Sequence, residues 1–394
     1  MDDLPLFPFP PGPVMEPPPE YAERRSGCPF GKVAMRTGGE AILLVRHRDI
    51  AAATASPLMS RNHARPQVPR GNSPDFLYAP DLLINQGTDT HAKVHRTVTR
   101  ALGPSRVAST SEFVGSIAGA LLDSAPDTAG PADLVAAYTS PLPLLVVCRL
   151  LRIPDRDAAR IHAWAAAYAQ VISLTSEERD REVEDFTGYV AALVTRVRDD
   201  PGDSVLDELA SPAAGLTDAE LVSVVKLLVS AGVEAVSTAL ARMVLQLLLD
   251  RRAGWTQLRE RPESVPAAVD ELLRLAYEGN VAALRVATGK VELPSGTVAA
   301  GQAVLLAWIA GLHDPEVYPD PTRLRFDRPS VRMIGFGGGR HICPGAGLAK
   351  EILRVALTTL LDRRPDLRLA VPPEAIRFEA HKIGNVIQEL PVRW

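Results

Sequence analysis

The sequence predicts a mainly helical fold with a small β region. Apolar residues recur at spacings of three and four from residue 90 to about residue 250, which is the period of amphipathic helices. One helix begins at Thr217 and continues to about Arg251, which corresponds to roughly 50 Å of helix. Between residues 284 and 306, short apolar runs alternate with glycine and proline, a pattern typical of small strands and hairpins.

Length, composition and charge describe a globular protein. The chain has 394 residues, of which 46% are hydrophobic, and this is enough to form a large core and excludes intrinsic disorder for most of the chain. Its length alone allows two or three domains. The formal net charge of −4 argues against a nucleic-acid-binding protein that works by bulk charge.

The remaining elements follow in chain order. Residues 1–19 contain eight prolines and predict an extended arm over the surface, and Ala41–Val45 predicts a buried strand. Residues 57–80 predict a long irregular loop. Two further helices are expected at residues 265–276 and 344–364. Helix breakers divide the helical region at four places: Gly103-Pro104, Gly130-Pro131, Pro154 and Pro201-Gly202.

The long helix has a defined start and a strongly apolar composition. Thr217 and Glu220 have the spacing of a capping box, in which each side chain accepts a hydrogen bond from an amide at the helix start. A helix this long and apolar is expected to cross the centre of a globule. Three charged residues interrupt it: Lys226, Glu234 and Arg242. No stretch therefore reaches the roughly 20 uncharged apolar residues of a membrane span, and we expect a soluble cytoplasmic protein.

The three cysteines have different surroundings. Cys28, Cys148 and Cys343 are too few and too scattered for a disulfide framework, and Cys148 lies in an apolar run typical of a core. Cys343 follows a glycine-rich run and directly precedes a helix, whose positive dipole end favours a thiolate. Such a thiolate suits one axial bond to a metal, as in haem proteins. A structural turn and a phosphate-binding loop are the alternatives.

The residues around Cys343 resemble the haem-binding signature of the cytochrome P450 superfamily, Phe-Gly-x-Gly-x-His-x-Cys-x-Gly. All of the specified positions match: Phe336, Gly337, Gly339, His341, Cys343 and Gly345. The resemblance implies that Cys343 is the axial ligand of the haem iron. It covers residues 20–394 and implies the P450 fold, a triangular helical prism with haem between the long helix and the cysteine loop. Because the motifs converge on one haem, we expect a single domain after the arm of residues 1–19.

A second motif precedes the signature. Glu271 and Arg274 fit the Glu-x-x-Arg pattern of the family, and residues three apart share one face of a helix. An isolated match of this kind is usually a surface salt bridge. Beside the cysteine signature, the resemblance implies a structural ion pair, which Arg328 completes.

A third motif lies in the middle of the long helix, where the family has Ala-Gly-x-acid-Thr-Thr/Ser. Ala231, Gly232 and Glu234 match, but Ala235 replaces the alcohol that usually helps to deliver protons to bound dioxygen. Three explanations are open: a substrate hydroxyl or ordered water replaces the alcohol, Ser237 or Thr238 replaces it, or the reaction needs little oxygen insertion. For Glu234, the alternative interpretation is a charge with a purely structural role.

A fourth site begins at His91. His91 and His95 have the i, i+4 spacing of a zinc helix, but Ala92 stands where the catalytic version has glutamate, so zinc is not expected. The resemblance implies that His91 contacts a haem propionate, with His95 or Arg96 taking the place of the family's arginine. Arg285 and His341 match the other propionate partners.

Basic residues on the same helix suggest a docking face. Lys93, Arg96 and Arg100 are three to four residues apart, which places them on one side of the helix. A solvated face is the alternative interpretation. The resemblance implies that an acidic ferredoxin, itself reduced by a ferredoxin reductase, docks here.

The resemblance implies a soluble actinobacterial-type monooxygenase that uses haem b (iron protoporphyrin IX), O2 and electrons from NAD(P)H. The expected substrate is a bulky apolar or aromatic secondary-metabolite intermediate, as in antibiotic biosynthesis. The alternatives are an atypical member that performs oxidative coupling, ring closure or rearrangement, which Ala235 suggests, and a non-catalytic haem sensor. The expected pocket residues are largely apolar: Val229, Val233, Val236, Asn280, Val281, Ala282, Ala283, Ile383 and Val386.

Overall fold

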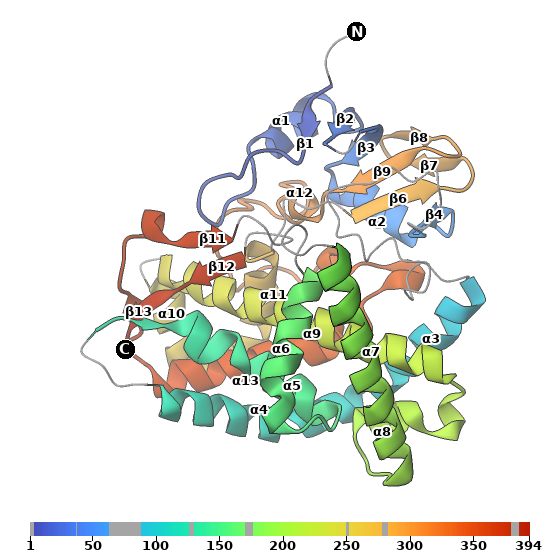
Figure 1. Ribbon diagram of the computed structural model, residues 1–394. Helices are drawn as coiled ribbons and strands as arrows, with labels where there is room; N and C mark the ends of the chain where they lie inside the picture. Colours follow the sequence, from blue (N-terminus) through green and yellow to red (C-terminus); the bar gives the residue numbers. More distant parts are fainter. Residues whose placement is uncertain are drawn as a thin grey trace. The chain divides into compact units, whose positions relative to one another are not determined.

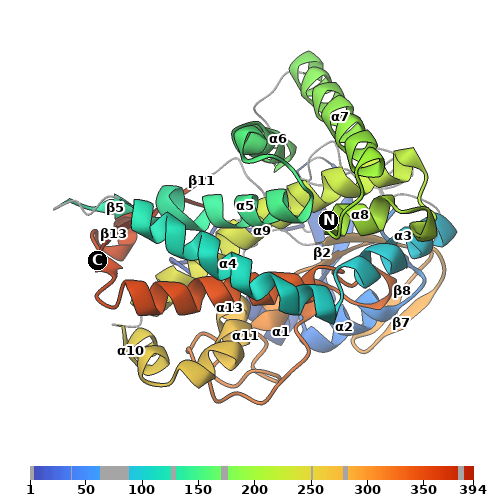
Figure 2. The same ribbon diagram turned by 90° about the horizontal axis from the view of Figure 1, so that it is seen from below.

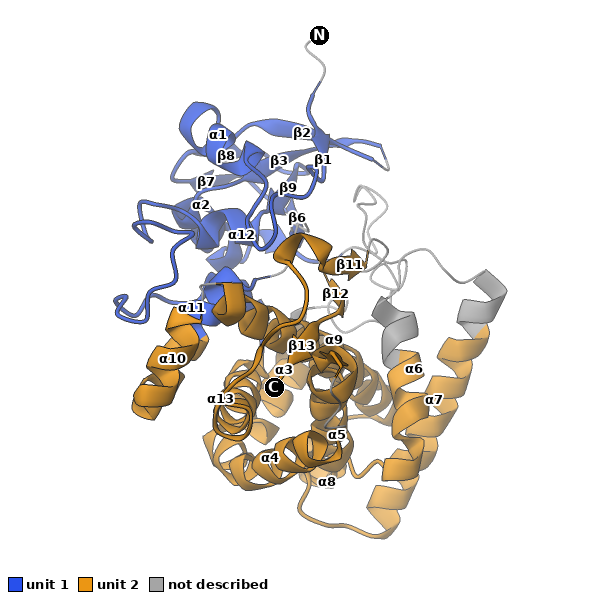
Figure 3. Ribbon diagram, turned by 90° about the vertical axis from the view of Figure 1, so that its left-hand side faces the viewer, with its two compact units in different colours: residues 1–80, 270–343, 383–385 blue, residues 81–269, 344–382, 386–394 orange. Residues whose placement is uncertain are grey.

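The computed structural model describes most of the chain (Figure 1). It covers residues 4–36, 38–62, 88–125, 130–169, 176–249, 252–277, 283–379 and 386–394. The chain divides into two compact units (Figure 3): unit 1 contains residues 1–80, 270–343 and 383–385, and unit 2 contains residues 81–269, 344–382 and 386–394. The described residues are mainly helical with small sheets, which confirms the predicted fold class. The single domain expected for residues 20–394 stays a prediction.

Unit 1 is built on a six-stranded sheet of order β1-β2-β3-β9-β6-β4. Its strands are β1 (Leu6–Phe7), β2 (Lys32–Met35), β3 (Glu40–Leu44), β4 (Met59–Ser60), β6 (Ala283–Ala287) and β9 (Ala303–Leu306). The pairs β1–β2 and β3–β9 are parallel, and the other pairs are antiparallel. A hairpin joins β7 (Val291–Leu293) to β8 (Gly296–Val298). The helices are α1 (Glu20–Gly27), α2 (His47–Ala55), α12 (Trp308–Leu312) and the end of α11 (Val265–Leu275).

Both faces of this sheet are buried, because alternate residues of each strand contribute to different core clusters. Leu43 and Leu305 belong to one cluster, and Ile42 and Val304 to the other. This follows the two-residue period of a strand and explains why the central strands read as continuous apolar runs. The predicted strand at residues 41–45 is confirmed as β3.

The N-terminal arm differs from its prediction. Phe7 and Phe9 are 7% and 5% exposed and pack in the same cluster as Tyr21. The parallel pairing of β1 with β2 draws the arm into the core, so the expectation that it lies over the surface is wrong for these residues.

Unit 2 is mainly helical. Its helices are α3 (Thr88–Ala101), α4 (Pro104–Ser124), α5 (Pro141–Leu150), α6 (Ala158–Ala169), α7 (Ser176–Asp199), α8 (Val205–Ala210), α9 (Asp218–Leu249), α10 (Ala253–Glu260) and α13 (Ala346–Arg363). Its short strands are β5 (Ala132–Asp133), β10 (Arg368–Leu369), β11 (Arg377–Glu379), β12 (Val386–Glu389) and β13 (Pro391–Arg393). Figure 2 shows α13 running alongside α4, and α9 packs against α5, α6 and α7. The predicted break at Gly103-Pro104 separates α3 from α4.

Helix α9 begins as predicted. The Thr217 amide donates to Glu220 Oε2 at 2.8 Å, and the Glu220 amide donates to Thr217 Oγ1 at 3.2 Å, which confirms the capping box. By length and hydropathy alone α9 could span a membrane. Within unit 2, however, it packs against several helices, which is how the core helix of a globule uses an apolar surface.

Candidate functional site

The glycine-rich loop holds Cys343 in a tight turn of unit 1. The Cys343 amide donates to the Phe336 carbonyl at 2.8 Å, so the loop closes on itself. Gly339 has φ +57°, and a Cβ built there would lie 2.9 Å from the Thr54 carbonyl oxygen. Only glycine combines this backbone conformation with so close an approach to α2. The residue that the loop presents, Cys343, is exposed.

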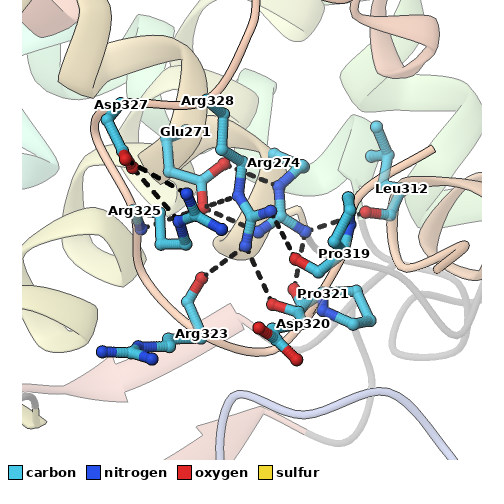
Figure 4. A network of polar contacts seen from close by, with 10 residues as sticks. All are labelled: Glu271, Arg274, Leu312, Pro319, Asp320, Pro321, Arg323, Arg325, Asp327 and Arg328. Carbon is cyan, nitrogen blue, oxygen red and sulfur yellow. Dashed lines mark hydrogen bonds and ion pairs between the residues drawn. The ribbon is translucent and has the colours of Figure 1, made fainter.

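Elsewhere in unit 1, the structure brings Glu271, Arg274 and Arg328 together (Figure 4). Arg274 donates through Nε and Nη2 to the two Glu271 carboxylate oxygens at 2.7 and 2.8 Å. Arg328 Nε donates to Glu271 Oε1 at 2.9 Å. Glu271 and Arg274 are 6% and 2% exposed, so this is a buried network rather than a surface salt bridge.

The two arginines also fasten a long irregular segment. Arg274 Nη1 donates to the Leu312 and Pro321 carbonyls, and the Arg328 guanidinium donates to the Pro319, Asp320 and Arg323 carbonyls. Carbonyl groups that no helix or strand satisfies thereby obtain donors. The network fixes residues 312–328 to α11 within unit 1.

Arg285 on β6 is a buried cation. It is 4% exposed, and its Nη1 donates to the Leu284 carbonyl at 2.8 Å. Burial lowers the pKa of Arg285, and the nearby charge of Arg61 lowers it further. Arg61 is a residue that the sequence motifs did not indicate. His341 is partly buried in the cysteine loop of the same unit.

The second group of expected haem contacts lies on α3 in unit 2. The rings of His91 and His95 stack with centroids 5.6 Å apart, and His91 is 5% exposed. Arg96 is exposed. The haem-contact roles of these residues stay predictions.

The middle of α9 presents an alanine face. Ala231 and Ala235 are exposed, one turn apart, whereas Val229, Val233 and Val236 are buried. Glu234 is partly buried. Gly232 serves close helix packing, because a Cβ there would lie 3.2 Å from Val147 Cγ2 of α5. Ser237 and Thr238 are 9% and 2% exposed, so their hydroxyls do not share the exposed face of Ala235.

The expected pocket is only partly described. Asn280, Val281, Ala282 and Ile383, with most of the 57–80 loop, lie outside the described residues. Ala283 is partly buried, and Val386 is 7% exposed. The lining role of all these residues stays a prediction.

Two of the three expected docking cations have acidic partners. Lys93 Nζ lies 2.6 Å from Glu220 Oε1, and Arg100 Nε lies 3.5 Å from Glu208 Oε1. The Arg100 side chain is nevertheless 61% exposed. Part of the positive charge on α3 is therefore used in ion pairs within unit 2.

Comparison with known proteins decides the family. The family model of cytochrome P450 matches residues 134–364, more than half of the chain. The chain belongs to the cytochrome P450 family. It is 35% identical over 381 residues to nocardicin C N-oxygenase from Nocardia uniformis subsp. tsuyamanensis, covering 95% of both proteins. It is 33% identical over 386 residues to mycinamicin IV hydroxylase/epoxidase from Micromonospora griseorubida, covering 95% of this chain and 94% of that protein.

Solved structures agree. The crystal structure of the LnmA cytochrome P450 hydroxylase, from the leinamycin biosynthetic pathway of Streptomyces atroolivaceus S-140, matches with a TM-score of 0.91 at 32% identity, over 99% of this chain and all of that chain. The fold is therefore the predicted P450 fold. The protein is an oxidoreductase of the monooxygenase type, and the family implies haem, redox partners and a small-molecule substrate.

The described residues fit a haem group. Cys343 offers an exposed thiol, the protein ligand that P450 haem iron takes. Arg285 is buried and Arg61 is partly buried, and in the part of the chain that the structure describes neither forms an ion pair, which suits an anionic group.

Proposed function

We propose that this P450 is a cytoplasmic haem b monooxygenase that oxidises a bulky apolar or aromatic secondary-metabolite intermediate. The proposal is carried by the complete signature from Phe336 to Gly345, in a loop whose cysteine is exposed. The relatives described above are named as oxygenases and hydroxylases, two of them for nocardicin and mycinamicin substrates. Oxidative coupling and a non-catalytic sensor are less favoured for the same reason.

The chain's own residues have separate tasks in this proposal. Bound haem would supply the activation of dioxygen for oxygen insertion. Cys343 Sγ would bind the haem iron. Arg285, His341 and the α3 residues His91, His95 and Arg96 neutralise the propionates.

Proton delivery and electron supply complete the proposal. Glu234 passes protons toward the site. Ala235 has no hydroxyl, so an ordered water or a substrate hydroxyl donates the hydrogen bond that the family's alcohol would donate at this position. Electrons come from NAD(P)H through a ferredoxin reductase and a ferredoxin.

The ligand assignment is tested by spectroscopy. The reduced protein treated with carbon monoxide is expected to show the red-shifted Soret band of thiolate-ligated haem, and Cys343→Ala is expected to lose it. Cys28→Ala removes another exposed cysteine and should leave the band unchanged. A band that survives Cys343→Ala contradicts the assignment.

The reaction class is tested by following an oxygen isotope into the product. Substrates are first found by the low-to-high-spin optical shift and then turned over with ferredoxin, its reductase and ¹⁸O-labelled dioxygen. Label in the product supports monooxygenation. An unlabelled oxidised product supports coupling, and NAD(P)H oxidation that no substrate stimulates supports a sensor.

A further inference from the structure

Two arginines lie opposite each other at the edge of the unit 1 sheet. β4 pairs antiparallel with β6, with Met59 opposite Ala287 and Ser60 opposite Val286. Continuing this register by one residue brings Arg61 opposite Arg285. Residues directly opposite on neighbouring strands have side chains on the same face. Met59 and Ala287 lie on the same face of the sheet as the two arginines, and both belong to one core cluster.

This pair is unfavourable without a third group. Arg285 is 4% exposed, and Arg61 Nε is buried without a hydrogen-bond partner. The Arg285 side chain donates to the neighbouring Leu284 carbonyl. Among the described residues, neither arginine forms an ion pair. Like charges directly opposite destabilise a sheet, and a buried cation such as Arg285 needs an anion, so the arrangement points to an anionic ligand.

The position of the pair indicates where that ligand lies. Burial lowers the pKa of Arg61, and the negative charge that Cys343 carries as a thiolate raises it, so the guanidinium is within electrostatic reach of the cysteine loop. The same guanidinium lowers the pKa of Arg285. The strand pairing therefore brings the two cations together, and Cys343 belongs to the same unit.

We propose that Arg61 and Arg285 form a two-arginine binding site for a carboxylate. Each planar guanidinium presents parallel N–H groups that match the two oxygens of a carboxylate. This inference rests on the proposed function, since the carboxylate belongs either to a haem propionate or to the substrate. Arg61 is its new member, because the family resemblance already suggested a role for Arg285.

The first arm of the test measures haem retention. Four full-length proteins are compared: wild type, Arg61→Gln, Arg61→Lys and the control Arg48→Gln. The control removes an exposed arginine of the same unit. Each protein is loaded with haem and, separately, with haem dimethyl ester, which has no free carboxylates. Transfer to apomyoglobin gives the dissociation rate. For a propionate, we expect Arg61→Gln to release haem about ten- to a hundredfold faster, Arg61→Lys to rescue part of this, and all proteins to release the ester alike.

The second arm measures carboxylic-acid ligands. For a substrate carboxylate, we expect Arg61→Gln to leave haem release unchanged and to weaken the optical shift caused by aromatic carboxylic acids, but not by their amides. If Arg61→Gln changes neither haem release nor acid binding, the inference is overturned. If the wild-type protein lacks the thiolate-haem spectrum, the proposed function is contradicted. If the wild-type spectrum is normal but Arg61→Gln has wild-type haem release and acid binding, only this inference is contradicted.

Discussion

At the scale of single residues, position 235 separates this chain from the family pattern. Ala235 is exposed and carries no hydroxyl, while the nearest alcohols in the chain, Ser237 and Thr238, are buried. The second explanation of the missing alcohol, replacement by these residues, is therefore less favoured than a water or a substrate hydroxyl. The proposed proton path therefore uses a hydrogen-bond donor other than Ser237 and Thr238.

The pair of variants Ala235→Thr and Ala235→Val tests this interpretation. Threonine and valine have nearly the same shape, so both should weaken substrate binding by overfilling the site, at a cost of about 1–3 kcal/mol. Only threonine adds a hydroxyl. We expect Ala235→Thr to form more product per NAD(P)H than Ala235→Val, measured together with released peroxide. Equal coupling in the two variants would mean that the missing alcohol is incidental.

Residues differ in how far the sequence reveals them. Cys343 and the Glu271–Arg274 pair are found by short-range spacing, because a turn and a helix face are local structures. The role of Arg61 cannot be found in this way, because its relation to Arg285 depends on the pairing of β4 with β6, and these strands are far apart in the chain. In the sequence, Arg61 is one of three arginines in the proline-rich stretch of residues 57–80, and nothing local distinguishes it from the other two.

At the scale of elements, Glu220 joins two helices. It caps the start of α9 through the Thr217 amide and binds Lys93 of α3. Burial raises the pKa of the Glu220 carboxyl, but the hydrogen bonds from Lys93 and from Thr217 outweigh it, and the pKa lies below its usual value. The folded state therefore holds this proton less tightly than the unfolded state does.

This shift sets a pH dependence. The stability contributed by Glu220 is fully present above its unfolded pKa of about 4.3 and is lost as the pH falls through the lowered folded value. We expect Glu220→Gln to lower the free energy of unfolding at pH 7 by about 1 kcal/mol, and the difference from wild type to shrink in acid. Urea unfolding at pH 7, 5 and 3.5 measures it, with the exposed Glu263→Gln as control. A pH-independent difference would contradict this explanation.

The helices were predictable because their signals are local. The expected helix from 217 to about 251 is α9, Asp218–Leu249, and the expected helix at 344–364 is α13, Ala346–Arg363. Strand order was not predictable, because β3 pairs in parallel with the distant β9. The same kind of long-range pairing, of β1 with β2, accounts for the unexpected burial of Phe7.

At the scale of the whole molecule, net charge and local charge make opposite contributions to partner binding. The chain carries a formal charge of −4, which repels an acidic ferredoxin. At physiological salt, charges act over about 8 Å, so the encounter depends on the surface next to the partner. Arg96 and Arg100 of α3 are exposed, while Lys93 is engaged by Glu220. We therefore expect a local attraction that is weaker than three free cations would give.

Stopped-flow reduction by a ferredoxin, the proposed electron donor, measures this attraction. If the α3 face is the docking site, the reduction rate falls as salt is added, and Arg100→Glu lowers it about three- to tenfold at low salt. Arg259→Glu makes the same charge change on exposed α10 and is expected to have a much smaller effect, since any general repulsion is common to both variants. A rate that rises with salt and falls equally in the two variants would mean that net charge governs the encounter and that the ferredoxin docks elsewhere.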